Sequence, residues 1–168
     1  MLDTGIGTGL SALPFSRAGL EVYGLDGSAE MLQICRRKNI AIELKQWDLR
    51  IVPWPYPDQF FDHVVACGLF HFFSDLEPAF WETARLVKLQ GIFAFTIKAP
   101  EPDSESGIVP KYTSTTIDGV QIFSHHEIYI KELLTRMGFE RMKELRFLQS
   151  RGEPGQYDPY TAYICLRH

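Results

Sequence analysis

The stretch Leu2-Asp3-Thr4-Gly5-Ile6-Gly7-Thr8-Gly9 decides the fold class of this chain of 168 residues. Three alternate glycines after a hydrophobic and acidic start are typical of a sharp turn between a strand and a helix. Such a turn lets a ligand approach the backbone closely, and the helix start offers unpaired N–H groups. We therefore expect a strand to end at Asp3 and a helix to span 10–18, where Gly19 stops it.

Strand and helix patterns alternate after this turn. Strands are predicted over 22–25, 40–47, 60–67 and 92–97, and helices from Ser28 to the basic residues at 36–38 and over 78–89. A helix over 126–137 and two strands, 139–148 and 160–166, joined by the Gly/Pro-rich turn at 152–155, close the chain. We predict one α/β domain over residues 1–168: a doubly wound, mostly parallel sheet with helices on both faces and a C-terminal antiparallel β-hairpin.

Composition excludes several classes of protein. Hydrophobic residues make up 45% and charged residues 23%, as in a folded domain. A net charge of -4 without a dense basic stripe argues against nucleic acid as a partner. No run of about 18 apolar residues and no signal segment is present, so we expect a soluble, cytoplasmic protein with no membrane partner. Three scattered cysteines, Cys35, Cys67 and Cys165, predict buried thiols and neither a disulfide framework nor a metal site.

Four residues with reactive or polar side chains fall at the ends of successive predicted strands: Asp3, Asp26, Asp48 and Cys67. The carboxyl ends of parallel strands meet at one edge of a sheet, and ligands bind there at the switch in strand order. A carboxylate that accepts two hydrogen bonds suits a ribose diol. The sequence therefore predicts a ligand site at this edge.

Four blocks of the sequence, taken in order, carry a resemblance to a known family. Residues 2–9 resemble the (V/L)-L-(D/E)-x-G-x-G-x-G motif of class I S-adenosylmethionine-dependent methyltransferases, whose fold is Rossmann-like. Residues 24–32, Asp48, and residues 61–67 with His71 are similar to the family's later blocks. A dinucleotide-binding fingerprint would need GxGxxG, but position 10 is leucine.

The resemblance implies S-adenosylmethionine as the cofactor and assigns roles to the strand ends. Asp26 would bind the ribose and Asp48 the adenine amino group, while Asp3 would lie near the ammonium of the methionine part. Met31, Leu49 and Trp47 would sandwich the adenine ring. The full set of cofactor-binding residues implied is Asp3, Gly5, Gly7, Gly9, Asp26, Gly27, Met31, Asp48, Leu49, Cys67 and Gly68.

Catalytic residues are harder to predict, because methyl transfer from an activated sulfonium depends mainly on positioning. His71 follows the fourth strand and is a candidate base or substrate ligand, with a structural role as the alternative. His125 and His126, which we expect to open a helix, are weaker candidates for the same cleft. The polar segment 98–118 is the longest predicted loop and is therefore expected to act as a substrate-side lid.

Three functions stay open on the sequence. The first is an S-adenosylmethionine-dependent methyltransferase for a small-molecule acceptor, since the chain lacks the Asn-Pro-Pro-Tyr and Pro-Cys motifs of DNA methylases. The second is a non-catalytic protein of the same fold that acts by binding or interaction. The third, a nicotinamide-dependent oxidoreductase, is disfavoured by the glycine spacing.

The chain begins two residues before Asp3, whereas family members normally carry a helix and most of the first strand before the glycine motif. We therefore expect an open cofactor pocket and exposed strand surface. Such surface favours association, so a homodimer that covers this face, or a marginally stable monomer, is the corresponding prediction.

Overall fold

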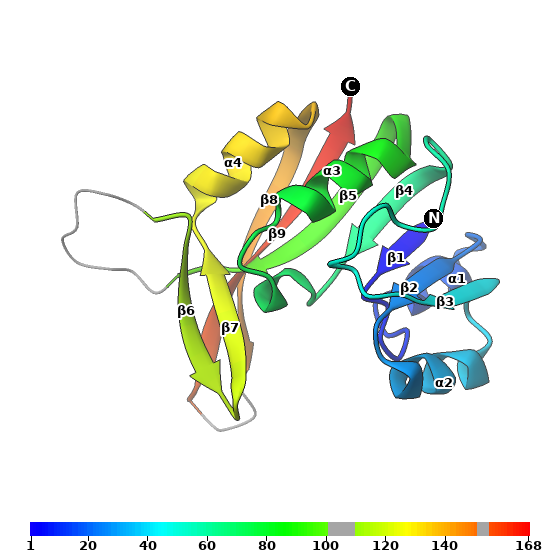
Figure 1. Cartoon of the computed structure of the whole chain (residues 1–168), viewed down its shortest axis with the longest axis horizontal. Coiled ribbons are helices and arrows are strands. Elements are labelled where there is room, and N and C mark those ends of the chain that lie inside the picture. The colour runs from blue at the N-terminus through cyan, green and yellow to red at the C-terminus, as the bar shows by residue number, and fades with distance from the viewer. Residues whose placement is uncertain (101–109, 151–154) are drawn as a thin grey trace.

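The computed structural model describes residues 1–100, 110–150 and 155–168, and within them the dominant feature is a seven-stranded sheet (Figure 1). Its strand order is β3-β2-β1-β4-β5-β9-β8. The first five of these strands are parallel, and β9 runs antiparallel to both β5 and β8. The bounds are β1 (Leu2–Thr4), β2 (Tyr23–Asp26), β3 (Glu43–Gln46), β4 (Phe61–Ala66), β5 (Val87–Lys98), β8 (Phe139–Ser150) and β9 (Tyr157–Arg167).

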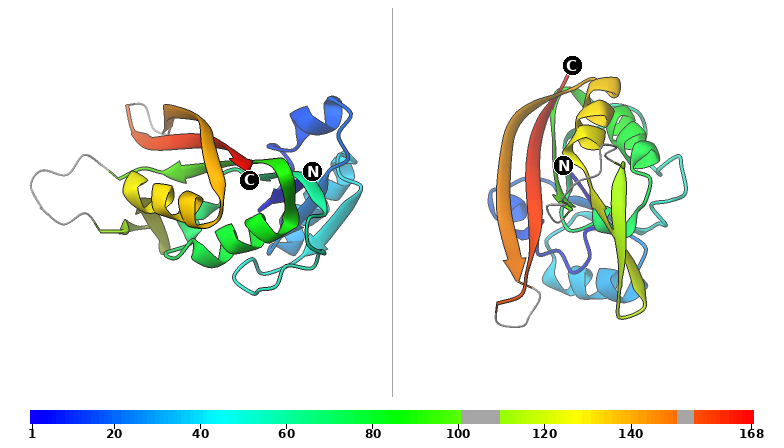
Figure 2. Two further views of the ribbon diagram at one scale, coloured as in Figure 1. Left: turned by 90° about the horizontal axis from the view of Figure 1, so that it is seen from above. Right: turned by 90° about the vertical axis from the view of Figure 1, so that its left-hand side faces the viewer.

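The predicted fold class is confirmed, because the order reverses at β1 and the chain closes with an antiparallel pair. Helices α1 (Leu13–Arg17) and α2 (Ala29–Lys38) share one face of the sheet, and α3 (Glu77–Leu86) and α4 (Glu127–Arg136) share the other (Figure 2). The hydroxyl of Ser28 accepts a hydrogen bond from the Met31 N–H at 3.2 Å and so caps α2 as expected.

Two hydrophobic cores lie on the two faces of the sheet. The larger core joins the sheet to α3 and α4 through stacked and edge-to-face aromatic rings, among them Phe70, Phe80, Phe93 and Phe95. The smaller core packs α1 and α2 against the opposite face. Strand β4 serves both, since adjacent side chains of a strand point to opposite faces. Val64 lies in the larger core and Val65 in the smaller.

Two predicted elements begin three residues later than expected. Helix α1 begins at Leu13 rather than at residue 10, because Gly9 has a φ of +83° and residues 10–12 continue the turn. Strand β3 covers only 43–46 of the predicted 40–47. Ile40 instead packs its side chain into the smaller core directly after the left-handed cap residue Asn39 of α2.

The prediction of one long loop over 98–118 was wrong. Residues 101–109 lie outside the described residues, but β6 (Tyr112–Ile117) pairs antiparallel with β7 (Val120–His125) in a separate two-stranded sheet. Asp118 and Gly119 form the tight turn, with φ values of 50° and 79°, as an Asp-Gly pair favours. His125 therefore ends a strand, and only His126 lies at a helix start, as the N-cap residue of α4.

None of the helices in the described parts of the chain is long and apolar enough to cross a membrane.

Candidate functional site

A cavity of about 960 Å³ opens where the strand order reverses, at the carboxyl ends of β1 to β4. This is the edge at which open α/β sheets bind ligands. The glycine turn, the loops after β2 and β3, and the loop after β4 form its walls. The lining residues are Gly5, Ile6, Gly7, Thr8, Leu10, Ser11, Asp26, Gly27, Ser28, Met31, Asp48, Leu49, Arg50, Cys67, Gly68, Leu69, Phe72 and Phe73.

The structure brings most of the predicted cofactor-binding residues together around this cavity. Those that line it are Gly5, Gly7, Asp26, Gly27, Met31, Asp48, Leu49, Cys67 and Gly68. Asp3, Gly9, Trp47 and His71 do not line it. These four residues therefore lie behind or beside the wall of the cavity rather than on its surface.

The glycine turn is tied to the end of β2 by hydrogen bonds from the N–H groups of Gly5 and Ile6 to the Leu25 carbonyl oxygen and by one to a side chain. The Gly7 N–H donates to Asp26 Oδ2 at 2.8 Å, with Gly7 at a φ of +53°. Gly9 serves packing instead, because a Cβ built there would lie 2.3 Å from Ile40 Cδ1 and 2.8 Å from Cys35 Sγ. One side of the glycine turn thus lines the cavity, and the other side packs against α2.

Asp26 is held at both carboxylate oxygens by backbone donors. Its Oδ2 accepts the Gly7 N–H and its Oδ1 accepts the Ser28 N–H, each at 2.8 Å. A carboxylate has about four lone-pair sites, so both oxygens can accept a further hydrogen bond from a ligand in the cavity. The arrangement suits a pair of neighbouring hydroxyl groups.

Asp3 lies beneath the turn and is fully buried. Its Oδ2 accepts a hydrogen bond of 2.6 Å from the hydroxyl of Ser11, which itself lines the cavity. Its Oδ1 has no hydrogen-bond partner among the described residues. Burial raises the pKa of this carboxyl to about 7. A nearby cation would stabilise the ionised form of this buried carboxyl, which fits a ligand that carries an ammonium group.

Asp48 is bound by an arginine that the sequence reasoning missed. Arg50 donates from Nε to Oδ1 at 2.9 Å and from Nη2 to Oδ2 at 2.8 Å. These hydrogen bonds lower the pKa of Asp48, so its carboxylate is ionised at neutral pH. The signal was available, because a residue two positions after an aspartate at a turn is in reach of its carboxylate. The pair is exposed, so a ligand donor can displace the guanidinium at little cost.

The cysteine at the end of β4 differs from the other two. Cys35 and Cys165 are buried as expected, whereas Cys67 is exposed and lines the cavity, so the expectation of a buried thiol was wrong there. Partial desolvation raises the pKa of the Cys67 thiol, which is therefore protonated at neutral pH and a poor nucleophile. The backbone N–H of its neighbour Gly68 donates to Thr96 Oγ1 at 2.9 Å, which fixes this wall of the cavity.

The aromatic wall is formed by Phe72 and Phe73, which follow β4 in and after the short 3-10 helix η1 (Phe70–Phe72). His71 of the same helix lies outside the cavity, with its ring 4.1 Å from that of Phe72 and 6.1 Å from that of Tyr160. Burial, and then the charge of Lys98, lower the pKa of His71 to about 4. Its imidazole is thus neutral at physiological pH.

His125 and His126, which lie between β7 and α4, do not line the cofactor cavity. His125 is fully buried, and its Nε2 lies 3.2 Å from the carbonyl oxygen of Phe70, so that β7 packs on η1. Both His125 and His126 line a second cavity of about 460 Å³, between β7 and the β9 strand, together with Tyr160 and Tyr163.

A glycine turn at the switch point of an α/β sheet, with an acid ending the second strand, defines a protein that binds a nucleoside-containing cofactor. The sequence profile of the methyltransferase domain family matches residues 2–95, and the chain belongs to this family. The predicted family, its Rossmann-like fold and its cofactor class are confirmed. Two solved structures that share this fold, at 16% and 19% sequence identity, are described as S-adenosylmethionine-dependent methyltransferases.

Individual relatives agree with this assignment. The demethylmenaquinone methyltransferase of Tropheryma whipplei (strain Twist) is 33% identical over 91 residues, which are 54% of this chain and 38% of that protein. That of Thermus thermophilus is 34% identical over 113 residues, or 65% and 51%. An S-adenosylmethionine-dependent methyltransferase structure from Mesorhizobium loti aligns with a TM-score of 0.79 at 19% identity, covering 99% of this chain and 89% of that one. The chain thus spans about half the length, or less, of these two curated relatives.

Proposed function

We propose that this chain binds S-adenosylmethionine in the 960 Å³ cavity and transfers its methyl group to a small-molecule acceptor. The observation that carries the proposal is the position of Asp26, which lines the cavity at the end of β2 and whose two oxygens are oriented by the Gly7 and Ser28 N–H groups. A carboxylate held in this way accepts the two hydroxyls of a ribose.

The other ends of the cofactor fit the remaining walls. Asp48 and Leu49 would receive the adenine, with Met31 on the opposite side of the ring. The methionine part would lie along the glycine turn, where the buried acid Asp3 favours an ammonium group. When bound, the cofactor supplies an activated methyl group. The residues of this chain bind and orient it.

The polar groups of the turn argue against the nicotinamide alternative. A pyrophosphate at a glycine turn needs free backbone N–H groups, but the Gly7 N–H is already donated to Asp26. Helix α1 begins only at Leu13, so its N-terminus is not presented directly after the glycines. Two acids, Asp3 and Asp26, also make this turn unfavourable for an anion.

The acceptor would enter beside the aromatic wall. Phe72 and Phe73 line the end of the cavity next to Cys67, and both present apolar surface to an acceptor there. A pKa of about 4 makes His71 a weak base at neutral pH, which favours positioning over proton abstraction as the source of catalysis. The named activity of the two demethylmenaquinone methyltransferases is compatible with an apolar acceptor. A catalytic role of His71 and a cytoplasmic location stay predictions.

Calorimetric titration tests the proposal. S-adenosylhomocysteine should bind the wild type, and Asp26→Ala should weaken this binding at least tenfold, or about 1.4 kcal/mol. Asp62→Ala is the matched control, since Asp62 is an exposed acid of β4 that pairs with Lys88 away from the cavity. Unchanged affinity in a folded Asp26 variant, or tighter binding of NAD than of S-adenosylhomocysteine, would contradict the proposed site.

A further inference from the structure

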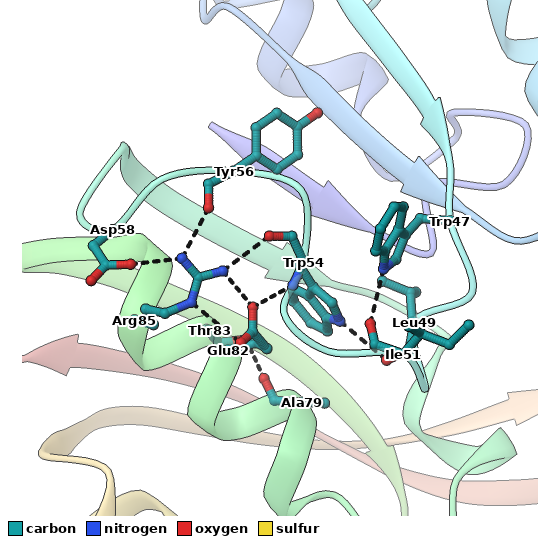
Figure 3. Close-up of polar contacts among 10 residues, drawn as sticks. All are labelled: Trp47, Leu49, Ile51, Trp54, Tyr56, Asp58, Ala79, Glu82, Thr83 and Arg85. Carbon is teal, nitrogen blue, oxygen red and sulfur yellow. Dashed lines mark hydrogen bonds and ion pairs between the residues drawn. The ribbon is translucent and has the colours of Figure 1, made fainter.

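A buried carboxylate on α3 lies at the centre of a cluster of polar contacts (Figure 3). Glu82 is fully buried, and its Oε2 accepts the backbone N–H of Trp54 at 2.7 Å. The Arg85 guanidinium donates to the same oxygen at 2.6 Å and to Oε1 at 3.2 Å. Burying a carboxylate is costly even when it is paired, so a buried ion pair is by itself weak evidence of added stability.

The partner of this carboxylate extends the cluster along the loop between β3 and β4, residues 47–60. Arg85 donates to the carbonyl oxygens of Tyr56 at 2.9 Å and of Trp54 at 3.1 Å, and it pairs with Asp58 at 2.7 Å. The Arg85 carbonyl also accepts the N–H of Gln59 at 2.8 Å. Two side chains of one helix therefore fix much of the backbone of a loop that has no regular structure.

The same loop forms a wall of the cofactor cavity. The indole of Trp54, which is 1% exposed, donates from Nε1 to the carbonyl oxygen of Leu49 at 3.1 Å. Leu49 and its neighbours Asp48 and Arg50 line the cavity. A continuous chain of hydrogen bonds thus runs from Glu82 through the backbone and indole of Trp54 to Leu49.

We propose that Glu82, Arg85 and Trp54 are positioning residues for the adenine end of the cofactor. They hold the Leu49 carbonyl, and with it the direction of the Leu49 side chain and of the Asp48 carboxylate. This inference rests on the proposed placement of adenine at Asp48 and Leu49. A loop with prolines at 53, 55 and 57 has no strand or helix hydrogen bonds of its own. Without the cluster, the loop would become ordered only when the cofactor binds, and the entropy lost would weaken that binding.

Trp54→Phe is the most specific test, because it keeps a buried aromatic ring and removes the indole N–H donated to Leu49, together with part of the ring. We expect the dissociation constant for S-adenosylhomocysteine to rise three- to tenfold in a variant that remains folded. Trp81→Phe is the matched control, since Trp81 lies in α3, is 52% exposed and makes none of the hydrogen bonds to the loop described above. Glu82→Gln should weaken binding in the same direction as Trp54→Phe.

A double-mutant cycle separates positioning from a merely structural role. The effect of Trp54→Phe on affinity should be smaller in an Asp48→Asn background, because the group it positions is already impaired. In an Asp26→Asn background, the fold-changes in dissociation constant caused by Trp54→Phe and by Asp26→Asn should multiply. A fold-change that multiplies equally with both backgrounds indicates general damage and overturns the inference.

The single variants distinguish the two proposals. If Asp48→Asn weakens binding and Trp54→Phe does not, the positioning role is wrong and the proposed cofactor site stands. If Asp48→Asn binds S-adenosylhomocysteine as the wild type does, the placement of adenine fails and the positioning role fails with it.

Discussion

The two halves of the sheet are built on different principles. In the ligand half, β1, β2 and β3 have only 3, 4 and 4 residues, and each ends in a turn that contributes to the cavity. In the hairpin half, β5, β8 and β9 have 12, 12 and 11 residues. The ligand half places its important groups at strand ends, whereas the hairpin half pairs long strands in register.

Exposure follows the same division. Strand β8 buries only Phe139 and exposes large side chains such as Leu145, at 65% exposed. Ile164 of β9 is also partly exposed, at 39%. The hairpin half therefore tolerates solvent on its outer strand, while the ligand half is packed on both faces of β1 and β4. The predicted homodimer was expected to cover the face beside the glycine motif, not this outer strand, and it stays a prediction.

The comparison predicts its largest effect at Gly9. Gly9→Ala should lower the free energy of unfolding by about 2 to 4 kcal/mol, because it combines an unfavourable φ with overpacking against Cys35 and Ile40. Gly119→Ala is the control in the β6–β7 turn, with a similar φ of +79° but open space around its Cβ. It should cost about 1 to 2 kcal/mol, from strain alone. Urea unfolding of both variants measures the difference, and equal losses would contradict the packing role of Gly9.

The next effect concerns pH and Asp3. The pKa of this acid is 3.8 in an unfolded chain and about 7 in the fold, so the unfolded chain loses its proton first as pH rises. The contribution of Asp3 to stability therefore decreases between about pH 4 and pH 7 and is constant above that range. Relative to the wild type, Asp3→Asn should gain on the order of 4 kcal/mol across this window.

Denaturation at several pH values, without ligand, measures the gain of Asp3→Asn. Asp62→Asn is the control, because Lys88 lowers the pKa of this exposed acid. The contribution of Asp62 to stability therefore changes with pH in the opposite direction to that of Asp3. A difference between Asp3→Asn and the wild type that does not change with pH would show that Asp3 is ionised in the fold throughout.

The smallest effect is expected in the hairpin half. Arg146 is 71% exposed and pairs with Glu127 and Glu144 at 2.9 and 3.0 Å. Arg146→Ala should leave both the affinity for S-adenosylhomocysteine and the thermal midpoint nearly unchanged, since exposed ion pairs contribute little. A large loss of affinity would mean that the hairpin half takes part in the cofactor site, and the division drawn here would fail.

The sequence predicted the ligand half well because its signals are local. A glycine turn and acids at strand ends are visible as patterns, and Asp26 lies where the pattern placed it. Gly9 and Asp3 belong to the same pattern but lie behind the wall, because their surroundings depend on Ile40, Cys35 and Ser11 packing from elsewhere in the chain.

The hairpin half and the supporting contacts were less predictable. Strand β6 was assigned to a loop because its residues are polar, although the Asp118-Gly119 turn signalled a hairpin. The contact of Glu82 with Trp54 joins residues 28 positions apart and has no local signal. Tertiary contacts of this kind can be identified only once the three-dimensional structure is known.

The two backbone hydrogen bonds to Asp26 have a consequence for how fast and how tightly a ligand is held. A carboxylate that is free to rotate loses rotamer entropy when it binds, and this loss reduces affinity. The Asp26 carboxylate is already oriented in the ligand-free chain, so little of that entropy remains to be lost. A ribose should therefore meet its acceptor in the binding-competent orientation at the first encounter. Substitutions that release Gly7 or Ser28 from this carboxylate should then slow productive association as well as speed dissociation.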